Sequence, residues 1–190
     1  MPYPENLYTV PACLKCNQAF SLDEEYVAVL IEWIKGMENG TGNFEREHIN
    51  RIIEHSSAIE ERLFASLLVD ESGKQYFKPE HNRIKNIVLK HAIGHVFYDL
   101  GMKLSEKPSI CAYKPNYLLT NKEIESFNLP IRDTVWPEVG SRLMQRQVEC
   151  GNSWITVQEK NYRYYVHQST TILVRIVFRE LLFCEVVWEI

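Results

Sequence analysis

The sequence predicts an α+β protein, because helix signals fill about the first two thirds of its 190 residues and strand signals fill the rest. Before Pro130, apolar residues recur at spacings of three and four, which is the period of an amphipathic helix. After Pro137, the chain is rich in Val, Ile, Thr, Tyr, Phe and Trp, the residues that strands favour. We therefore expect an N-terminal turn and helices, a long central helix, and a C-terminal antiparallel β-meander.

The first helix is expected within an N-terminal part that covers residues 1–38. Ser21 and Glu24 have the spacing of a capping box, in which a hydroxyl and a carboxylate bond to free amides at a helix start. An apolar stripe that includes Trp33 follows at helical spacing. The expected helix therefore runs from about Leu22 to Lys35, and the glycines beyond it end it.

The second part, residues 39–190, is expected to begin with helices between residues 43 and 128. One helix begins near residue 43, and a second capping box, formed by Ser57 and Glu60, opens the next helix. Residues 70–74 are polar and include a glycine, so a turn is expected there.

The longest helix is expected from Pro79 to Leu100, at the centre of the core. Proline is tolerated at the first helical position, because the amide missing there needs no partner, and Gly101 has the usual place of a C-terminal stop. Thr120 and Glu123 form a third capping box, which predicts a short helix after it.

The strands are expected between residues 141 and 190, where runs of strand-forming residues alternate with turns. Gly151-Asn152 and Lys160-Asn161 separate the first runs. Successive strands joined by short turns pair in the antiparallel direction, so the runs predict a meander. The expected strands are Ser141–Val148, Trp154–Gln158, Tyr162–His167, Thr170–Arg179 and Leu181–Glu189.

Composition limits the partners and the compartment. The formal net charge of -4 argues against a dominant basic surface, so a DNA-binding patch would have to be local or supplied by another chain. Five cysteines, an odd number, do not predict the disulfide framework of a secreted protein. No apolar run approaches the roughly 18 residues of a membrane span, and the N-terminus lacks the features of a signal peptide. We therefore expect a cytoplasmic protein with no membrane segment.

Cys13 and Cys16 are the most informative residues of the chain. They lie three residues apart at an expected chain reversal, which allows both sulfurs to face one point. This is half of the ligand set that a tetrahedral structural zinc needs, so we expect a zinc-knuckle-like turn that forms a half-site. The alternative is a pair of thiols at a helix start without a metal.

The segment around these cysteines resembles the second half of the HNH endonuclease motif. The resemblance consists of Asn6-Leu7, a short strand-like stretch to Pro11, and Cys13-x-x-Cys16-Asn17 before a helix. The string from Val10 through Asp23-Glu24-Glu25-Tyr26 looks like a bacterial HNH-type family, in which this segment precedes a helical region and a β-rich C-terminus. The first 38 residues would then form a partial HNH-like knuckle and the first helix.

The resemblance implies roles for four residues. Cys13 and Cys16 would be the second pair of a four-cysteine structural zinc site. Asn17 would take the place of the final His or Asn, which binds a catalytic divalent cation such as magnesium, and Asn6 that of the middle Asn, which orients the loop. The implied activity is metal-dependent hydrolysis of a phosphodiester bond in DNA, with a histidine as the general base.

The first half of that motif is not found in the sequence. An upstream C-x-x-C and a Glu-His or Asp-His pair would precede Asn6, and only five residues do so. Glu47-His48 and Glu54-His55 have suitable letters, but they fall on an expected helix and are assigned to its surface. We therefore expect the chain to be inactive alone, and to need an HNH half encoded upstream of Met1 or self-association.

Three alternatives remain open at this point. The chain could be a non-catalytic nucleic-acid or protein interaction module that retains the scaffold, with Asn17 as a turn or capping residue. His91 and His95, one helical turn apart, could bind a metal together or pack in the core. Tyr162, Tyr164 and Tyr165 could stack on bases or form one face of a sheet.

Overall fold

The computed structural model confirms the α+β class, with six α-helices and a five-stranded antiparallel sheet among the residues that it describes. The chain divides into two compact units. The helical unit contains Cys13–Ile87, and the sheet unit contains Val88–Ile190 together with residues 9–12. The structure describes residues 9–38, 47–55, 57–69, 71–73, 75–131, 135–151 and 153–190.

Independent folding is a property of an isolated segment, whereas the two units reflect compactness within the whole chain. The expected boundary between residues 38 and 39 therefore stays a prediction.

Three helices and a small hairpin make up most of the helical unit. They are α1 (Leu14–Glu38), α2 (Glu47–His55), α3 (Ser57–Ser66), β1 (Leu67–Val69) and β2 (Gln75–Phe77), followed by the first turns of α4 (His81–Leu100). The buried face of α1 includes Tyr26, Val27 and Leu30. The turn expected at residues 70–74 is confirmed for the described residues 71–73, which join β1 to β2.

The first helix begins eight residues earlier than expected (22 − 14 = 8). Ser21 lies inside α1, where its hydroxyl donates to the carbonyl of Gln18 at 2.9 Å. The capping box expected at Ser21 is therefore wrong, because the amides that such a box would satisfy are already bonded within the helix. The start expected near residue 43 lies outside the described residues.

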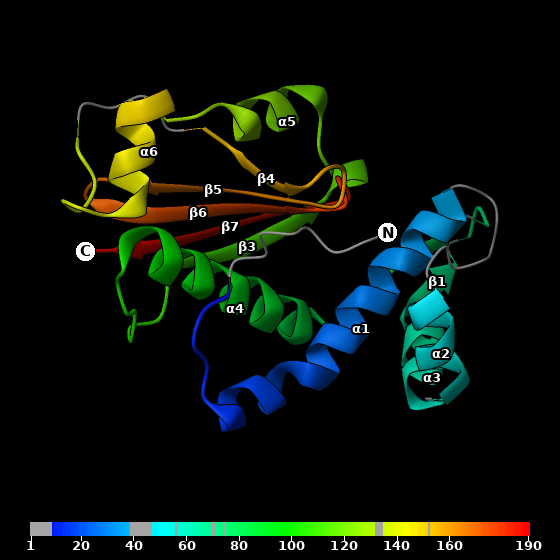
Figure 1. Ribbon diagram of the computed structural model, residues 1–190. Coiled ribbons are helices and arrows are strands. Elements are labelled where there is room, and N and C mark those ends of the chain that lie inside the picture. The colour runs from blue at the N-terminus through cyan, green and yellow to red at the C-terminus, as the bar shows by residue number, and fades with distance from the viewer. Residues whose placement is uncertain are drawn as a thin grey trace. The chain divides into compact units, whose positions relative to one another are not determined.

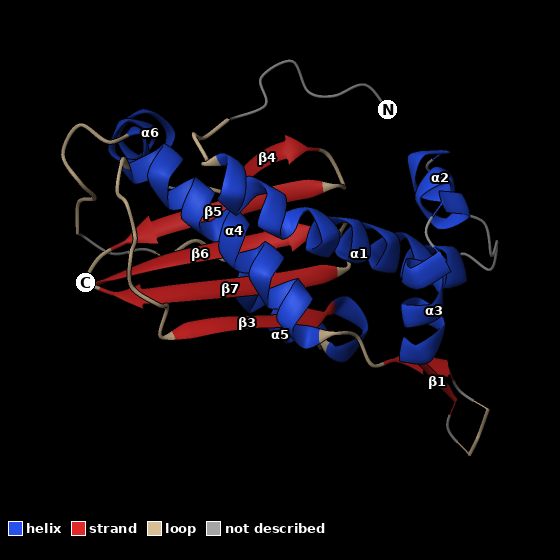
Figure 2. Cartoon of the chain, turned by 90° about the horizontal axis from the view of Figure 1, so that it is seen from below, coloured by secondary structure: helices blue, strands red, loops and turns tan. Residues whose placement is uncertain are grey.

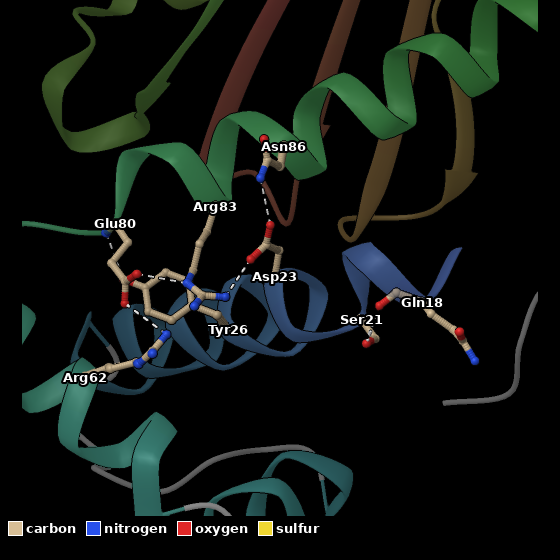
Figure 3. A network of polar contacts seen from close by, with 8 residues as sticks. All are labelled: Gln18, Ser21, Asp23, Tyr26, Arg62, Glu80, Arg83 and Asn86. Carbon is tan, nitrogen blue, oxygen red and sulfur yellow. Dashed lines mark hydrogen bonds and ion pairs between the residues drawn. The ribbon is translucent and has the colours of Figure 1, made fainter. Parts of the chain in front are cut away.

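Asp23 and Arg83 connect α1 to the beginning of α4 (Figure 3). Their carboxylate and guanidinium groups are 2.5 Å apart, and both side chains are mostly buried. The other Asp23 oxygen accepts a bond of 2.8 Å from the Asn86 amide. Arg83 Nε also donates to Glu80 at 2.9 Å, and these two carboxylates, with Glu80 first, raise the pKa of Arg83. The polar groups between the helices are thus paired, as burial requires.

The Tyr26 hydroxyl forms the neighbouring contact. It accepts a hydrogen bond of 2.9 Å from the backbone N–H of Glu80, just before α4 begins (Figure 3). Since only 1% of Tyr26 is exposed, this hydroxyl fixes the start of α4 from the apolar face of α1.

The sheet unit contains the expected meander. Its strand order is β3-β7-β6-β5-β4, so four strands that are consecutive in the chain are neighbours (Figure 2). β3 was not expected as a strand, and it joins the meander by antiparallel pairing with β7. The strands are β3 (Ile110–Pro115), β4 (Ile155–Gln158), β5 (Tyr162–Gln168), β6 (Thr171–Phe178) and β7 (Leu182–Glu189).

Helices cover both faces of this sheet. The part of α4 from Val88 onward lies on one face and α5 (Asn121–Asn128) on the other (Figure 1), whereas α6 (Arg142–Cys150) also contacts α4 through Arg146 and Asp99. Side chains of β5 alternate accordingly: Tyr162 contacts α4, and Arg163 bonds to the end of α5. None of the helices in the described part of the chain is both long enough and apolar enough to cross a membrane.

Two expected helix signals of the sheet unit are confirmed. Thr120 and Glu123 form the predicted capping box at the start of α5. Gly101 follows α4 with a φ of 70°, and its N–H donates to the carbonyl of Phe97, so the helix ends where the glycine predicted.

The strand expected at Ser141–Val148 is wrong, because this segment forms α6. Ser141 is the N-cap, and its hydroxyl accepts the N–H of Met144 at 3.1 Å. The cap satisfies an amide that a strand would have bonded to a neighbouring strand. The β-rich region therefore begins at β4.

The turn between β6 and β7 has an unusual backbone. Arg179 and Glu180 both have positive φ angles, 52° and 55°, and neither is a glycine or an asparagine. The Leu181 N–H closes the turn on the carbonyl of Phe178 at 3.0 Å. The Glu180 carboxylate accepts two bonds from Arg163, of 2.7 and 2.9 Å, which hold the turn against the sheet.

Replacing Tyr26 by phenylalanine should destabilise the chain by about 1–2 kcal/mol, because the Glu80 amide loses its partner while the buried ring remains. Chemical denaturation measures this loss. Tyr76→Phe is the matched control, since Tyr76 is 44% exposed. Equal midpoints for the two variants would show that the Tyr26 hydroxyl does not stabilise the start of α4.

Candidate functional site

The Cys13–Cys16 pair lies at the N-terminal end of α1. Cys13 occupies the N-cap position, since its carbonyl accepts the N–H of Asn17 at 2.9 Å and the helix begins at the next residue. Its sulfur accepts the N–H of Cys16 at 3.2 Å. The Cys13 sulfur therefore does what the oxygen of Ser or Asp does at an N-cap. The thiols lie on the first turn of α1 and not, as expected, on a separate turn before it.

The two thiols differ in acidity. The pKa of Cys13 is lowered, first by a hydrogen bond from the Cys16 thiol and then by the Cys16 N–H. The pKa of Cys16 is raised, because its thiol donates that bond and because it would ionise beside the negative charge of Cys13. Both side chains are exposed. The pair thus presents a favoured thiolate, Cys13, and a neighbouring proton donor.

These residues fit one half of a zinc site. Thiolate sulfur is the usual ligand of structural zinc, and four ligands are needed. Across the described ranges, no group of three or more His, Cys, Asp or Glu side chains could hold a metal ion. Asn17 is exposed on the same helical turn, bonded through its N–H to Cys13. Asn6, the other expected site residue, lies outside the described residues.

The pair of histidines on α4 belongs to a second cluster. His95 Nε2 lies 2.5 Å from the Tyr162 hydroxyl, and His91 Nδ1 lies 3.1 Å from the same oxygen. The His95 ring also stacks on Tyr164, with centroids 3.6 Å apart. A hydroxyl has one proton to donate, so it donates to one imidazole and accepts from the other. The two histidines therefore carry their protons in a coupled arrangement.

Burial keeps His95 and Tyr162 neutral. It lowers the pKa of His95 to about 3, with smaller contributions from the charges of His91 and Arg146. Burial also raises the pKa of Tyr162 well above its ordinary value, so its hydroxyl keeps its proton. His91 Nδ1 and His95 Nε2 both face the Tyr162 hydroxyl. The two histidines therefore pack as a hydrogen-bonded group, which was the expected alternative to a metal site.

A buried ion pair lies one turn further along α4. Asp99 is completely buried, and both of its oxygens accept bonds from Arg146 of α6, at 2.9 and 3.2 Å. Burial raises the pKa of Asp99, and the bonds from Arg146 oppose that rise. No sequence pattern predicted this pair. The residue that could have indicated a buried ion pair is Asp99, a carboxylate four residues after His95 on the apolar face of a helix.

The tyrosines of β5 do not form an exposed surface. Tyr164 and Tyr165 are both fully buried. Tyr164 stacks on His95, whereas the Tyr165 hydroxyl accepts the N–H of Ile131 on the other face of the sheet. The expectation that they share one face is therefore wrong for Tyr165, because successive residues of a strand point to opposite faces.

Neither a family model, nor a curated protein, nor a solved structure matches this chain. The assignment of a function therefore depends on the side chains described above and on the resemblance of the segment around Cys13.

The stability of the chain should fall as the pH drops below about 6.5, because the unfolded chain takes up a proton on His95 that the folded chain excludes until about pH 3. This one group contributes a slope of up to about 1.4 kcal/mol per pH unit. His95→Gln should flatten the dependence of unfolding free energy on pH, measured by urea denaturation between about pH 6 and pH 4.

His55→Gln is the control, since His55 is exposed at the end of α2. If His95→Gln kept the slope of the parent chain while His55→Gln reduced it, the buried histidine would not be the group responsible.

Proposed function

We propose that this chain is HNH endonuclease-like, a metal-dependent phosphodiester hydrolase by ancestry that acts on DNA. Cys13 and Cys16 contribute two thiolates to a structural zinc, and Asn17 lies beside the catalytic divalent cation, for which magnesium is suited. The remaining zinc ligands and the general base come from a separate segment that carries the first half of the motif, or the zinc ligands come from a second copy of the chain.

One observation carries this proposal. The Cys16 N–H donates to the Cys13 sulfur while both thiols are exposed on one helical turn. A backbone amide that points at sulfur stabilises the thiolate, which is the form that binds zinc. Asn17 follows directly and bonds to the carbonyl of the same cysteine, so its position is fixed by the same turn.

A bound zinc would stabilise this end of α1. Because ligands brought together by folding add the free energy of metal binding to that of folding, the first helical turn would resist fraying when the site is complete. The divalent cation would supply charge stabilisation for the reacting phosphodiester.

His95 is not suited to act as the general base. A base must accept a proton near neutral pH, and a histidine with a pKa of about 3 is a poor acceptor there. His95 is also bonded to Tyr162 through its Nε2. His95 therefore does not replace the histidine that the HNH motif places on its first strand.

A non-catalytic protein interaction module is the second candidate. It is favoured by apolar side chains that are exposed between α5 and α6, of which Trp136 is 60% and Val139 is 82% exposed. Exposed apolar side chains of this size often mark an interaction surface. Self-association that persists in a chelator and is lost in Trp136→Ser would support this candidate over the zinc-dependent one.

Zinc should bridge two copies of the isolated chain, because two thiolates from each copy complete a tetrahedral site. We expect about one zinc per two chains and a zinc-dependent dimer, measured by metal analysis and sedimentation velocity. Cys13→Ser should abolish both, and Cys150→Ser, a change at another exposed cysteine, should retain both. One tightly held zinc per monomer would mean that two further ligands lie within the chain.

The chain alone should not cut DNA with magnesium, manganese or nickel, since no histidine base is assigned beside Asn17. Plasmid cleavage should appear only when a segment carrying C-x-x-C and a Glu-His pair is fused or added in trans, and Asn17→Ala should abolish it. Cleavage by the chain alone that disappears in Asn17→Ala would contradict the missing base.

A further inference from the structure

We propose that Cys13 and Cys16 are a redox-active dithiol that closes reversibly to an intramolecular disulfide when it meets a low-molecular-weight disulfide. This goes beyond the nuclease-like proposal, because it requires no metal, no DNA and no second segment. It concerns the same two sulfurs in a reaction whose only other reactant is the low-molecular-weight disulfide.

The backbone already places the two residues at bonding distance. Cys13 is the N-cap of α1 and Cys16 is the third helical residue. Residues three apart in an α-helix have Cα atoms about 5 Å apart, from the rise and radius of the helix. Disulfides span Cα separations of about 4.4–6.8 Å. The bond can therefore form without unwinding α1.

The orientation of the Cys13 side chain favours the same reaction. Its sulfur lies 3.2 Å from the N–H of Cys16, so it is turned toward the residue that it would bond. The amide stabilises negative charge on this sulfur, which is the charge that the sulfur carries when it attacks a disulfide or leaves one.

Access separates this pair from the other cysteines. Both thiols are exposed, and Leu14 between them is itself 72% exposed. Cys184 is fully buried in β7, and Cys111 in β3 is only partly exposed. Cys150 is exposed, but its helix carries no second cysteine, so it can form a mixed disulfide without a neighbour on α6 to resolve it.

The reaction takes place in two exchanges. The Cys13 thiolate attacks one sulfur of the oxidant, whose S–S bond breaks, and the first thiol leaves with the electron pair and takes a proton from water. The Cys16 thiolate then attacks the Cys13 sulfur of this mixed disulfide and expels the second thiol, which is protonated in turn. Two cysteine thiols are oxidised to one disulfide, and the oxidant is reduced to two thiols.

The test uses the full chain, stripped of metal with a chelator and equilibrated with oxidised and reduced glutathione. Acid quenching, alkylation and peptide mass spectrometry then identify each sulfur bond. The parent chain and Cys150→Ser should both form the Cys13–Cys16 disulfide. Cys16→Ser should trap glutathione on Cys13, at a level about tenfold above that of the parent chain, because no second thiol resolves the mixed disulfide.

Cys13→Ser keeps a hydroxyl at the N-cap and so preserves the fold of the helix end, which circular dichroism confirms. In this variant glutathione should add to Cys16 more slowly than it adds to Cys13 in Cys16→Ser. A parent chain that accumulates glutathione on Cys13 as much as Cys16→Ser does, with no internal disulfide, would overturn the proposal. Loss of the zinc-bridged dimer alone would overturn only the nuclease-like proposal, since the disulfide forms without metal.

Discussion

Helices cover both faces of the five-stranded sheet, and the resulting burial limits which polar side chains the sheet unit can hold. The central strands β5 and β6 are buried along most of their length. A polar group in such a position costs free energy unless it finds a partner. On the α4 face, Tyr162 meets two imidazoles. On the other face, Arg163 and Arg175 bond to carboxylates and lie over Trp154 and Phe127.

The elements that the sequence predicted well are those whose signals are local. The meander follows from runs of strand-forming residues between turns. The capping box that indicates the start of α5 needs only Thr120 and Glu123, three residues apart. α6 was mistaken for a strand because its apolar residues are few, with only Leu143 buried, so Ser141 was the one clear helix signal. β3 was missed because its partner strand β7 lies more than 65 residues away in the chain, so no hairpin turn announces the pairing.

The candidate site was predicted in part for the same reason. Two cysteines three residues apart are visible in any sequence, whereas sulfur as an N-cap is not, because the residues usual at that position carry oxygen. The Asp99–Arg146 pair joins residues 47 apart, so no local pattern reveals it. Asn17 lies within α1 and not before a helix as the resemblance implied, and the role of Asn6 stays a prediction.

The two polar clusters differ in what they can do. His95 is buried and neutral, and it is hydrogen-bonded to the neutral Tyr162 phenol, so this pair stabilises the packing of α4 on the sheet. The thiols of α1 are exposed and bonded to each other, and the charge of Lys15 acts on Cys16. Chemistry with an outside molecule is therefore assigned to Cys13 and Cys16.

The turn at Arg179 and Glu180 has a consequence for how the sheet is built. Positive φ at both central residues is the pattern of a type I′ turn, whose twist matches that of the flanking strands. The turn therefore favours the antiparallel approach of β6 and β7, which face each other in eight registered pairs from Thr171 opposite Glu189 to Phe178 opposite Leu182. The turn and the strands thus specify the same register, although left-handed backbone costs each of the two turn residues about 1–2 kcal/mol.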